Sequence, residues 1–252
     1  MKNSTSVSKI INIIIGIVLL ILFWIILSYT NDNFVFPKIK TILSAFIDII
    51  TNKTIIINSL FSLLRVILVI LISLIISLII SFIYMIKKDS IYLFKPLIII
   101  LKSSPLAIIS VYLWISLGAN KAPYIITLLM ILPVIIEGFI SSLNNIDIMY
   151  INQLKTEDVS YVKKFFKIYI PLIMPYIFMT VLQSFGLGIK VMLMSEYICQ
   201  SNSSLGEIIY NYKQNLDFPH LLALLLLIVI IVSLIELMIN LISKKLIKNH
   251  TF

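Results

Sequence analysis

Apolar residues fill long runs along this chain, and short polar stretches separate the runs. The first run, Ile10 to Tyr29, has about 20 residues, which is the length that a helix needs to cross the hydrocarbon core of a bilayer. Similar or longer runs occupy residues 59–86, 92–117, 123–143, 171–197 and 221–242. The pattern predicts about six membrane-spanning helices and therefore an all-α polytopic membrane protein.

The segments between the runs differ in character. Residues 31–58 mix Lys38, Lys40 and Asp48 with apolar residues at the spacing of an amphipathic helix, which we expect at the external membrane interface. Pro105 falls inside the third run and predicts a kink or break there. Residues 198–220 form a second external segment. We divide the chain into 1–58, one span plus the external amphipathic segment, and 59–252, a core of five spans with a cytoplasmic loop at 144–170.

Composition supports this class and excludes several others. Hydrophobic residues make up 60% of the chain and charged residues 12%, and the mean hydropathy is +1.10, far from the balance of a soluble domain. Cys199 is the only cysteine, and His220 and His250 are the only histidines, so we expect no metal site and no cofactor. Clustered acid–base residues of an integral-membrane enzyme are missing, and no catalytic residue is predicted.

The lysines indicate the orientation in the membrane. The net charge of +9 comes from residues scattered through short loops, which cytoplasmic retention of basic residues explains better than nucleic-acid binding. About 12 fall on one side and about 5 on the other, which places both termini in the cytoplasm. The larger group is Lys2, Lys9, Lys87, Lys88, Lys95, Lys155, Lys163, Lys164, Lys167, Lys244, Lys245 and Lys248, and the smaller is Lys38, Lys40, Lys53, Lys121 and Lys213.

From about Phe36 onward, ordered sequence elements resemble those of the permease subunits of binding-protein-dependent ABC importers, in the branch of nitrate, sulfonate and taurine transport. The elements are Ser62-Leu-Leu-Arg65-Val, Phe94-Lys-Pro96, Lys102-Ser-Ser-Pro105-Leu-Ala107, Leu113-Trp114-Ile-Ser-Leu-Gly118, Leu132-Pro133 with Glu137-Gly138, and Glu196 followed by Leu205-Gly206.

The resemblance implies the type I importer permease fold and a transport subunit that is not itself an enzyme. The expected partners are a second, identical permease copy, two copies of an ABC ATPase, an external solute-binding protein and the lipid bilayer. The expected location is the plasma (inner) membrane of a prokaryote, and the expected solute is a small anion such as a sulfonate or nitrate, or a heteroaromatic metabolite. Consistently, the chain has no Gly-x4-Gly-Lys-[Ser/Thr] loop, so another chain must bind ATP.

The same resemblance assigns ATPase coupling to the loop at 144–170. The family pattern of Glu-Ala-Ala, Gly and Leu-Pro aligns with Asn152-Gln153-Leu154, Asp158 and Ile170-Pro171, with departures at Asn152, Leu154 and Asp158. Asp tolerates the positive φ that a Gly there would supply, and Ser160 is a candidate cap for a helix from Tyr161 to Tyr169. The candidate coupling residues are Asn152, Gln153, Leu154, Lys155, Asp158, Val159, Ser160, Phe165 and Pro171. The alternative is a solvated loop without a partner.

Candidate solute-pathway residues are polar groups inside apolar runs: Ser73, Ser77, Lys190 and Glu196. Ser73, Ser77 and Ser81 recur every four residues, a spacing that also serves close helix packing. Lys190 is a candidate because ionisable groups are costly in lipid.

Structural alternatives stay open for each charge. Lys190 would pair with Glu137 or Glu236 or snorkel to the interface, as Arg65 and Lys102 would near their helix ends. Glu137 and Glu196 have the alternative of helix caps or interface charges.

A secondary, ion-driven transporter is the rival function, with Glu137, Glu236 and Lys190 as ion sites. Such proteins usually show inverted repeats and more spans, and neither is evident in the sequence.

Overall fold

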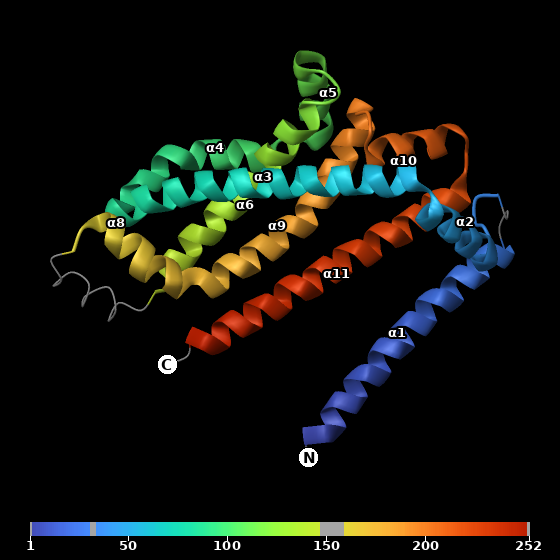
Figure 1. Cartoon of the computed structure of the whole chain (residues 1–252), viewed down its shortest axis with the longest axis horizontal. Coiled ribbons are helices and arrows are strands. Elements are labelled where there is room, and N and C mark those ends of the chain that lie inside the picture. Colours follow the sequence, from blue (N-terminus) through green and yellow to red (C-terminus); the bar gives the residue numbers. More distant parts are fainter. Residues whose placement is uncertain (1, 31–33, 147–158, 251–252) are drawn as a thin grey trace. The chain divides into compact units, whose positions relative to one another are not determined.

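The computed structural model describes residues 2–30, 34–146 and 159–250, and every regular element within them is helical (Figure 1). In chain order these elements are α1 (Lys2–Thr30), α2 (Ile39–Thr51), α3 (Lys53–Ile86), the 3₁₀ turn η1 (Lys88–Ser90), α4 (Ile91–Ser103), α5 (Leu106–Leu117), α6 (Ala122–Asn144), α8 (Tyr161–Lys164), the π-helical turn η2 (Phe165–Tyr169), α9 (Ile170–Cys199), α10 (Leu205–Gln214) and α11 (Phe218–His250). The predicted all-α class is therefore confirmed.

Five stretches are long and apolar enough to cross a membrane. They are Ile11–Thr30, Lys53–Ile86, Ala122–Asn144, Tyr161–Cys199 and Phe218–Leu241. A sixth is formed if α4 and α5, which meet at an angle of 99°, count as one span. The chain is thus a polytopic membrane protein.

The sharp bend between α4 and α5 lies at Ser104 and Pro105, where the sequence predicts a break. Both residues have extended backbone, with ψ of 129° at Ser104 and 122° at Pro105. Proline lacks an amide donor and disfavours the α conformation of the residue before it, which ends α4. The predicted break is confirmed.

The chain divides into two compact units, each described here on its own. Unit 1 contains residues 1–53 and 211–229, and unit 2 contains residues 54–210 and 230–252. The first boundary lies five residues before the one drawn from the sequence, and residues 211–229 join the N-terminal part.

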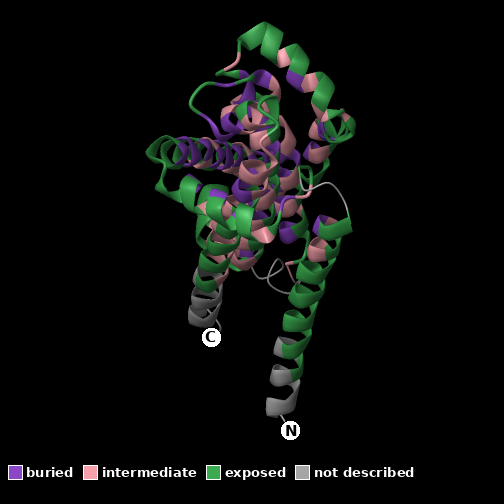
Figure 2. Ribbon diagram, turned by 90° about the vertical axis from the view of Figure 1, so that its right-hand side faces the viewer, coloured by how far each residue is buried: buried purple, intermediate pink, exposed green. Residues whose placement is uncertain are grey.

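In unit 1, α2 has the amphipathic character that its sequence predicts. Ile42, Ala45 and Ile49 are buried, whereas Lys40 and Asp48 are exposed. The connection before α2 is held by Trp24, whose Nε1 donates a hydrogen bond to the carbonyl of Pro37 at 3.3 Å. Figure 2 shows α1, the helix at the N label, exposed along nearly all of its described length, as expected of a helix whose solvent is lipid.

The centre of unit 2 is an antiparallel pair, α6 and α9, that approach closely at two glycines. A Cβ atom at Gly138 would collide with Thr180, and one at Gly188 would lie 2.7 Å from Ile131. Small residues let membrane helices approach each other in this way, because packing rather than water exclusion drives their association. Gly188 also faces Val66, so α3 packs on the same pair.

The helices α4 and α5 pack against different halves of α6. Ile98 of α4 joins a buried cluster with Leu132 and Ile136 in the C-terminal half of α6. Leu106 and Ile109 of α5 lie against Ala122 and Ile126 in its N-terminal half, together with Val191 and Cys199 of α9. The bent pair therefore covers the length of α6, with its break beside the middle.

Two boundaries differ from the sequence prediction. The helix α3 begins at Lys53 rather than Ser59, because the residues from Lys53 to Asn58 contain no Gly or Pro to stop a helix. A single helical stretch runs from Tyr161 to Cys199, so the predicted short helix and the fifth span are continuous. Pro171 lies inside this stretch, directly after the π-helical turn η2, and local π-helical turns are among the irregularities that accompany such sites within helices.

Candidate functional site

A buried carboxylate, Glu196 in the last turns of α9, is the centre of the most connected polar cluster in unit 2. Its side chain has no exposed surface. Arg65 of α3 donates from Nη1 to Oε1 at 2.7 Å, and Ser62 donates from Oγ to Oε2 at 2.7 Å. The backbone amide of Gly206 donates to Oε2 at 3.3 Å. Donors from α3 and α10 thus surround the carboxylate and balance its charge.

The same residues fix the loop between α9 and α10. Arg65 also donates from Nη2 to the carbonyl oxygens of Asn202 and Ser203 at 3.2 and 3.4 Å. The Oγ of Ser62 accepts a hydrogen bond from the amide of Leu205 at 2.9 Å. A Cβ at Gly206 would collide with the Cβ and backbone of Glu196, so only glycine fits here. We call Ser62, Arg65, Glu196, Leu205 and Gly206 the Glu196 cluster.

The Glu196 cluster corrects the sequence interpretation of two charges. Arg65 is paired with Glu196, and Glu196 lies in the packed interior of unit 2 rather than on an exposed surface. The cluster has no obvious chemistry beyond holding α3, α9 and α10 together. The sequence signal for this cluster was the presence of one basic and one acidic residue, Arg65 and Glu196, each within or beside an apolar run.

A second ion pair joins α4 to α6. Lys102 Nζ lies 2.8 Å from Oε2 and 3.0 Å from Oε1 of Glu137. Unlike Glu196, both side chains are about half exposed, at 51% and 48%. Glu137 therefore pairs with Lys102 and not with Lys190, as one alternative had it.

One face of α9 is exposed along its length although the helix belongs to a span. The face repeats at intervals of three and four residues, and we call it the α9 stripe: Leu172, Tyr176, Met179, Gln183, Leu187, Lys190 and Met194. Lys190 is exposed and makes no ion pair within the described part of the chain. Two strongly polar side chains, Gln183 and Lys190, therefore lie on a surface that the described residues leave uncovered.

The serines of α3 have the opposite environment. Ser73, Ser77 and Ser81 have no exposed surface, and their hydroxyl oxygens have no hydrogen-bond partner among the described residues. This burial fits the packing alternative, in which small side chains admit a neighbouring helix. A pathway role for Ser73 and Ser77 stays a prediction.

The candidate coupling residues are only partly described. Asn152, Gln153, Leu154, Lys155 and Asp158 lie outside the described residues.

Val159, Ser160 and Pro171 are exposed. Ser160 does stand directly before α8, as predicted, but its side chain makes no capping hydrogen bond.

Phe165 is the coupling candidate with a clear structural role. It has no exposed surface and packs edge-on against Phe82 of α3, with ring centroids 5.2 Å apart. The exposed apolar side chains beside it are Tyr161, Val162 and Phe166, at 63%, 54% and 56%. These three residues, which the sequence analysis did not single out, are therefore better placed to meet a partner than Phe165.

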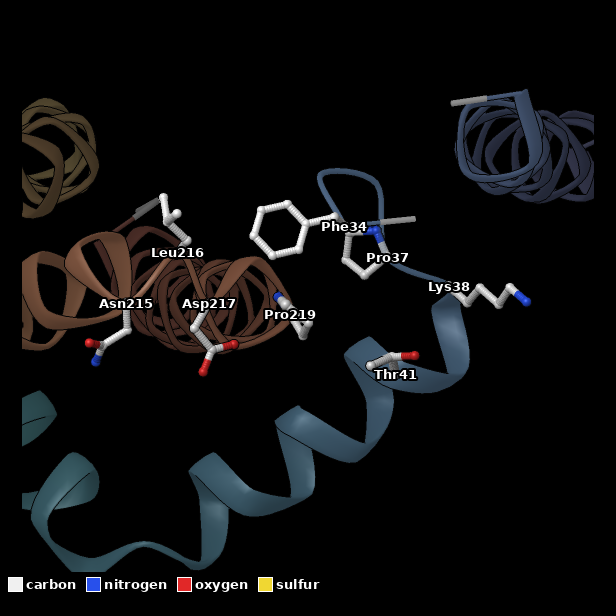
Figure 3. A pocket seen from close by; sticks show the side chains of 8 residues that line it. All are labelled: Phe34, Pro37, Lys38, Thr41, Asn215, Leu216, Asp217 and Pro219. Carbon is white, nitrogen blue, oxygen red and sulfur yellow. The ribbon is translucent and has the colours of Figure 1, made fainter. Parts of the chain in front are cut away.

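Unit 1 holds an open cavity of about 480 Å³ (Figure 3). Its lining residues are Phe34, Pro37, Lys38, Thr41, Asn215, Leu216, Asp217 and Pro219. Figure 3 shows the Lys38 side chain directed away from the other seven. The cavity thus lacks converging charged groups that would hold a small ion.

Beside this cavity, His220 connects three segments of unit 1. Its Nδ1 lies 2.8 Å from Asp217 Oδ2, its Nε2 lies 3.8 Å from Asp48 Oδ2, and its ring stacks on Tyr212 at 5.2 Å. Burial raises the pKa of the Tyr212 phenol, and the negative charges of Asp217 and Asp48 raise it further.

Neither a metal centre nor a family match defines the site. Within the described ranges, no group of three or more His, Cys, Asp or Glu side chains could hold a metal ion. Comparison of the sequence with models of known protein families and with curated proteins gives no match.

Proposed function

We propose that this chain is the membrane-spanning permease subunit of an ATP-binding-cassette importer. In this proposal two copies of the chain form the solute pathway, a separate cytoplasmic ATPase supplies the energy, and an external binding protein delivers the solute. The solute is a small anion such as a sulfonate or nitrate.

The observation that carries the proposal is the convergence of the resembling sequence elements in the Glu196 cluster. Three of the resembling elements meet here: the first contains Ser62 and Arg65, the second Glu196, and the third Leu205-Gly206. Arg65 and Glu196 are 131 residues apart in the chain, yet the three elements make direct hydrogen bonds with one another. A chance match of short motifs gives no reason for the matched residues to touch. Their mutual contacts support the resemblance as a property of the fold.

The α9 stripe supports a pathway and a second copy. An exposed lysine within a membrane span is costly in hydrocarbon and usually faces a protein interior or a water-filled cavity. Lys190 lies about 8 Å from the midpoint of α9, given a rise of about 1.5 Å per residue. A second copy packed along the α9 stripe, with a wet pathway at Gln183 and Lys190, gives these groups a polar environment.

The spans support a topology with both termini in the cytoplasm. If α4 and α5 form one broken span, the chain crosses the membrane six times. An even number of crossings returns the C-terminus to the side of the N-terminus, in agreement with the bias of the lysines. The proposed location is the plasma membrane of a prokaryote.

Coupling to the ATPase is assigned to residues 144–170. In this segment the exposed Tyr161, Val162 and Phe166 add an apolar surface to the residues predicted from the sequence. Because Phe165 packs on Phe82, a force on this surface also acts on α3.

Copurification tests the proposal directly. The chain should be expressed with the ATPase and the binding protein encoded beside it, purified, and reconstituted in liposomes for measurement of solute-stimulated ATP hydrolysis. The double variant Tyr161→Asp/Phe166→Asp should lose ATPase copurification at least tenfold, with unchanged elution in gel filtration. The matched control is Leu216→Asp, also at an exposed apolar residue but on the side expected to be external.

Two outcomes would overturn the proposal. One is solute uptake that proceeds without any ATPase and follows an ion gradient, which would favour the secondary transporter. The other is failure of the unsubstituted chain to form a complex with the ATPase. An undiminished complex with normal uptake in the double variant would overturn only the assignment of coupling to the surface at Tyr161 and Phe166.

A further inference from the structure

The Lys102–Glu137 ion pair lies between the middle and the C-terminal end of α6 in unit 2. Glu137 is followed by Gly138, whose backbone touches Thr180 of α9. Thr180 lies about 7 Å from the midpoint of α9, on the side of its N-terminal end. Glu137 itself is seven residues from the end of α6, which corresponds to about 10 Å. The pair is therefore well inside the span rather than at its end.

At this depth the pair is unusually exposed. Half of each side chain is uncovered, although the charged atoms lie only 2.8 Å apart. Lys102 is in the last turn of α4, but α4 ends beside the middle of α6, so its position gives no short route to the interface. Two half-exposed charges facing hydrocarbon would lose hydration without full compensation. A water-filled cavity on their open side would avoid this cost.

The backbone beside the pair is irregular. Ser104 and Pro105 are extended and separate α4 from α5. Non-helical backbone at membrane depth is stable only where protein buries it or where it lines a water-filled cavity, and Pro105 is exposed. Broken helices at mid-membrane are also where transporters place their solutes. The ion pair and the break thus point to the same wet region.

The geometry of the pair suggests what this region binds. The Lys102 ammonium group donates to both carboxylate oxygens of Glu137. A small oxyanion presents equivalent acceptor oxygens, so it can take the place of Glu137 on the same donor group. Glu137 would then act as an internal competitor that neutralises Lys102 when no solute is present.

We propose that Lys102 is a solute-contacting residue in a subsite within the membrane span for small oxyanions of the carboxylate or sulfonate type. Between transport events, Glu137 pairs with Lys102 in place of the solute. The assignment to a solute pathway rests on the proposed function. The water access and the charge of the subsite do not, and they are measured without the ATPase.

Thiol labelling of the full chain in membrane vesicles tests this subsite. Cys199 is the only cysteine and is buried, so Cys199→Ser supplies a background without reactive thiols. Single cysteines are introduced as Lys102→Cys or Glu137→Cys. Two membrane-impermeant methanethiosulfonate reagents are compared, one carrying a sulfonate and one carrying a trimethylammonium group. Each rate is divided by the rate of the same reagent with a small thiol in solution.

The expected result is a reversal of charge preference. In Glu137→Cys the unpaired Lys102 remains, so the sulfonate reagent should react several-fold faster than the ammonium reagent. In Lys102→Cys the unpaired Glu137 remains, so the ammonium reagent should react several-fold faster. The control is Ile100→Cys, which is 60% exposed but about 200° away around α4, and it should react at least tenfold more slowly with both reagents.

A third variant protects the test against misfolding. Ser103→Cys keeps both charges and changes the exposed last residue of α4, directly beside the extended Ser104 and Pro105. It should react with either reagent faster than Ile100→Cys, which lies about 4.5 Å farther from the break. If none of the three test cysteines reacts faster than Ile100→Cys, lipid or protein covers the pair and the proposal is wrong. The oxyanion assignment is equally wrong if both single substitutions give the same charge preference. If the unsubstituted chain failed to copurify with the ATPase, the proposed function would be contradicted, but these labelling rates would not change.

Discussion

Glu196 is the one acidic or basic residue that is fully buried within the described part of the chain. The burial of its charge depends on hydrogen bonds from neighbouring residues. Transfer of a carboxylate from water into the protein interior costs several kcal/mol, and Arg65 and Ser62 offset this cost through hydrogen bonds. Arg65 is itself only 12% exposed, so either partner alone would be a poorly solvated charge. The pair is therefore a condition for folding of this end of unit 2.

Removal of one partner should be more damaging than removal of both. We expect Glu196→Gln to lower the free energy of unfolding by about 3–5 kcal/mol, because Arg65 then loses its counter-charge. The thermal midpoint of the detergent-solubilised chain measures this. The double variant Arg65→Met/Glu196→Gln should regain part of the loss, although the contacts of Arg65 with the loop carbonyls are also gone. Equal midpoints for the single variant and the parent would contradict this account.

Gly206 gives a second prediction at the same cluster. Gly206→Ala should cost about 1–3 kcal/mol, because the added methyl group must push the start of α10 away from the α9 backbone. Gly16→Ala is the matched control, since a Cβ at Gly16 meets nothing within 4 Å. Thermal midpoints again provide the comparison, and similar midpoints for the two variants would show that α10 is not held as closely as its contacts indicate.

The sequence indicated which charges needed an explanation but not their partners. Arg65 and Glu196 are 131 residues apart, and Lys102 and Glu137 are 35 apart. Such pairs are set by how helices pack, and helical periodicity carries no information on packing between distant segments. The exposure of Lys190 and the burial of Phe165 were inaccessible for the same reason.

Ser73, Ser77 and Ser81 form a stripe on the buried face of α3. The hydroxyl groups have no partners within the described ranges, so the property that matters for packing is the small size of the side chain. An alanine occupies nearly the same volume without a polar atom to desolvate. A larger side chain has no space in a close-packed interface.

The triple variant Ser73→Ala/Ser77→Ala/Ser81→Ala should keep or raise the thermal midpoint. Ser77→Leu should lower the free energy of unfolding by about 1–3 kcal/mol because it overpacks the interface. Solute-stimulated ATP hydrolysis by the triple variant separates the two readings of this stripe. Retained stimulation supports packing, whereas lost stimulation with an unchanged midpoint would assign the hydroxyls to the pathway.

Individual helices were predictable where the determinant is local. Pro105 ends α4 through its own covalent structure, and apolar runs have the length of a bilayer whatever their neighbours. The helix α10 was missed because its residues are polar on average and its start depends on Ser204, which accepts a hydrogen bond from the amide of Glu207 at 3.0 Å. Continuity from Tyr161 to Cys199 was missed because Pro171 and Pro175 suggested the start of a helix, whereas the helical stretch continues through both.

The uncovered α9 stripe leads to a prediction about the assembled molecule. In a background of Cys199→Ser, Met179→Cys should form a disulfide-linked dimer on mild oxidation in membranes, because the stripe is proposed to face its copy. Ile79→Cys is the matched control on α3, since the two parent side chains are 56% and 59% exposed. Non-reducing gels give the dimer fraction. Equal dimer fractions for both variants would assign the stripe to lipid or to another partner.

The helix from Tyr161 to Cys199 has a mechanical consequence. Its 39 residues extend over about 58 Å, which is more than the thickness of a bilayer. It is fastened to α3 near both ends, through Phe165 on Phe82 and through Glu196 on Arg65. Two helices that are held together near both ends tilt as one rigid body. A tilt of about 5° over this length moves one end sideways by about 5 Å relative to the other. A displacement of Phe165 on one side of the membrane would therefore also move the loop after Cys199 on the other side of the membrane.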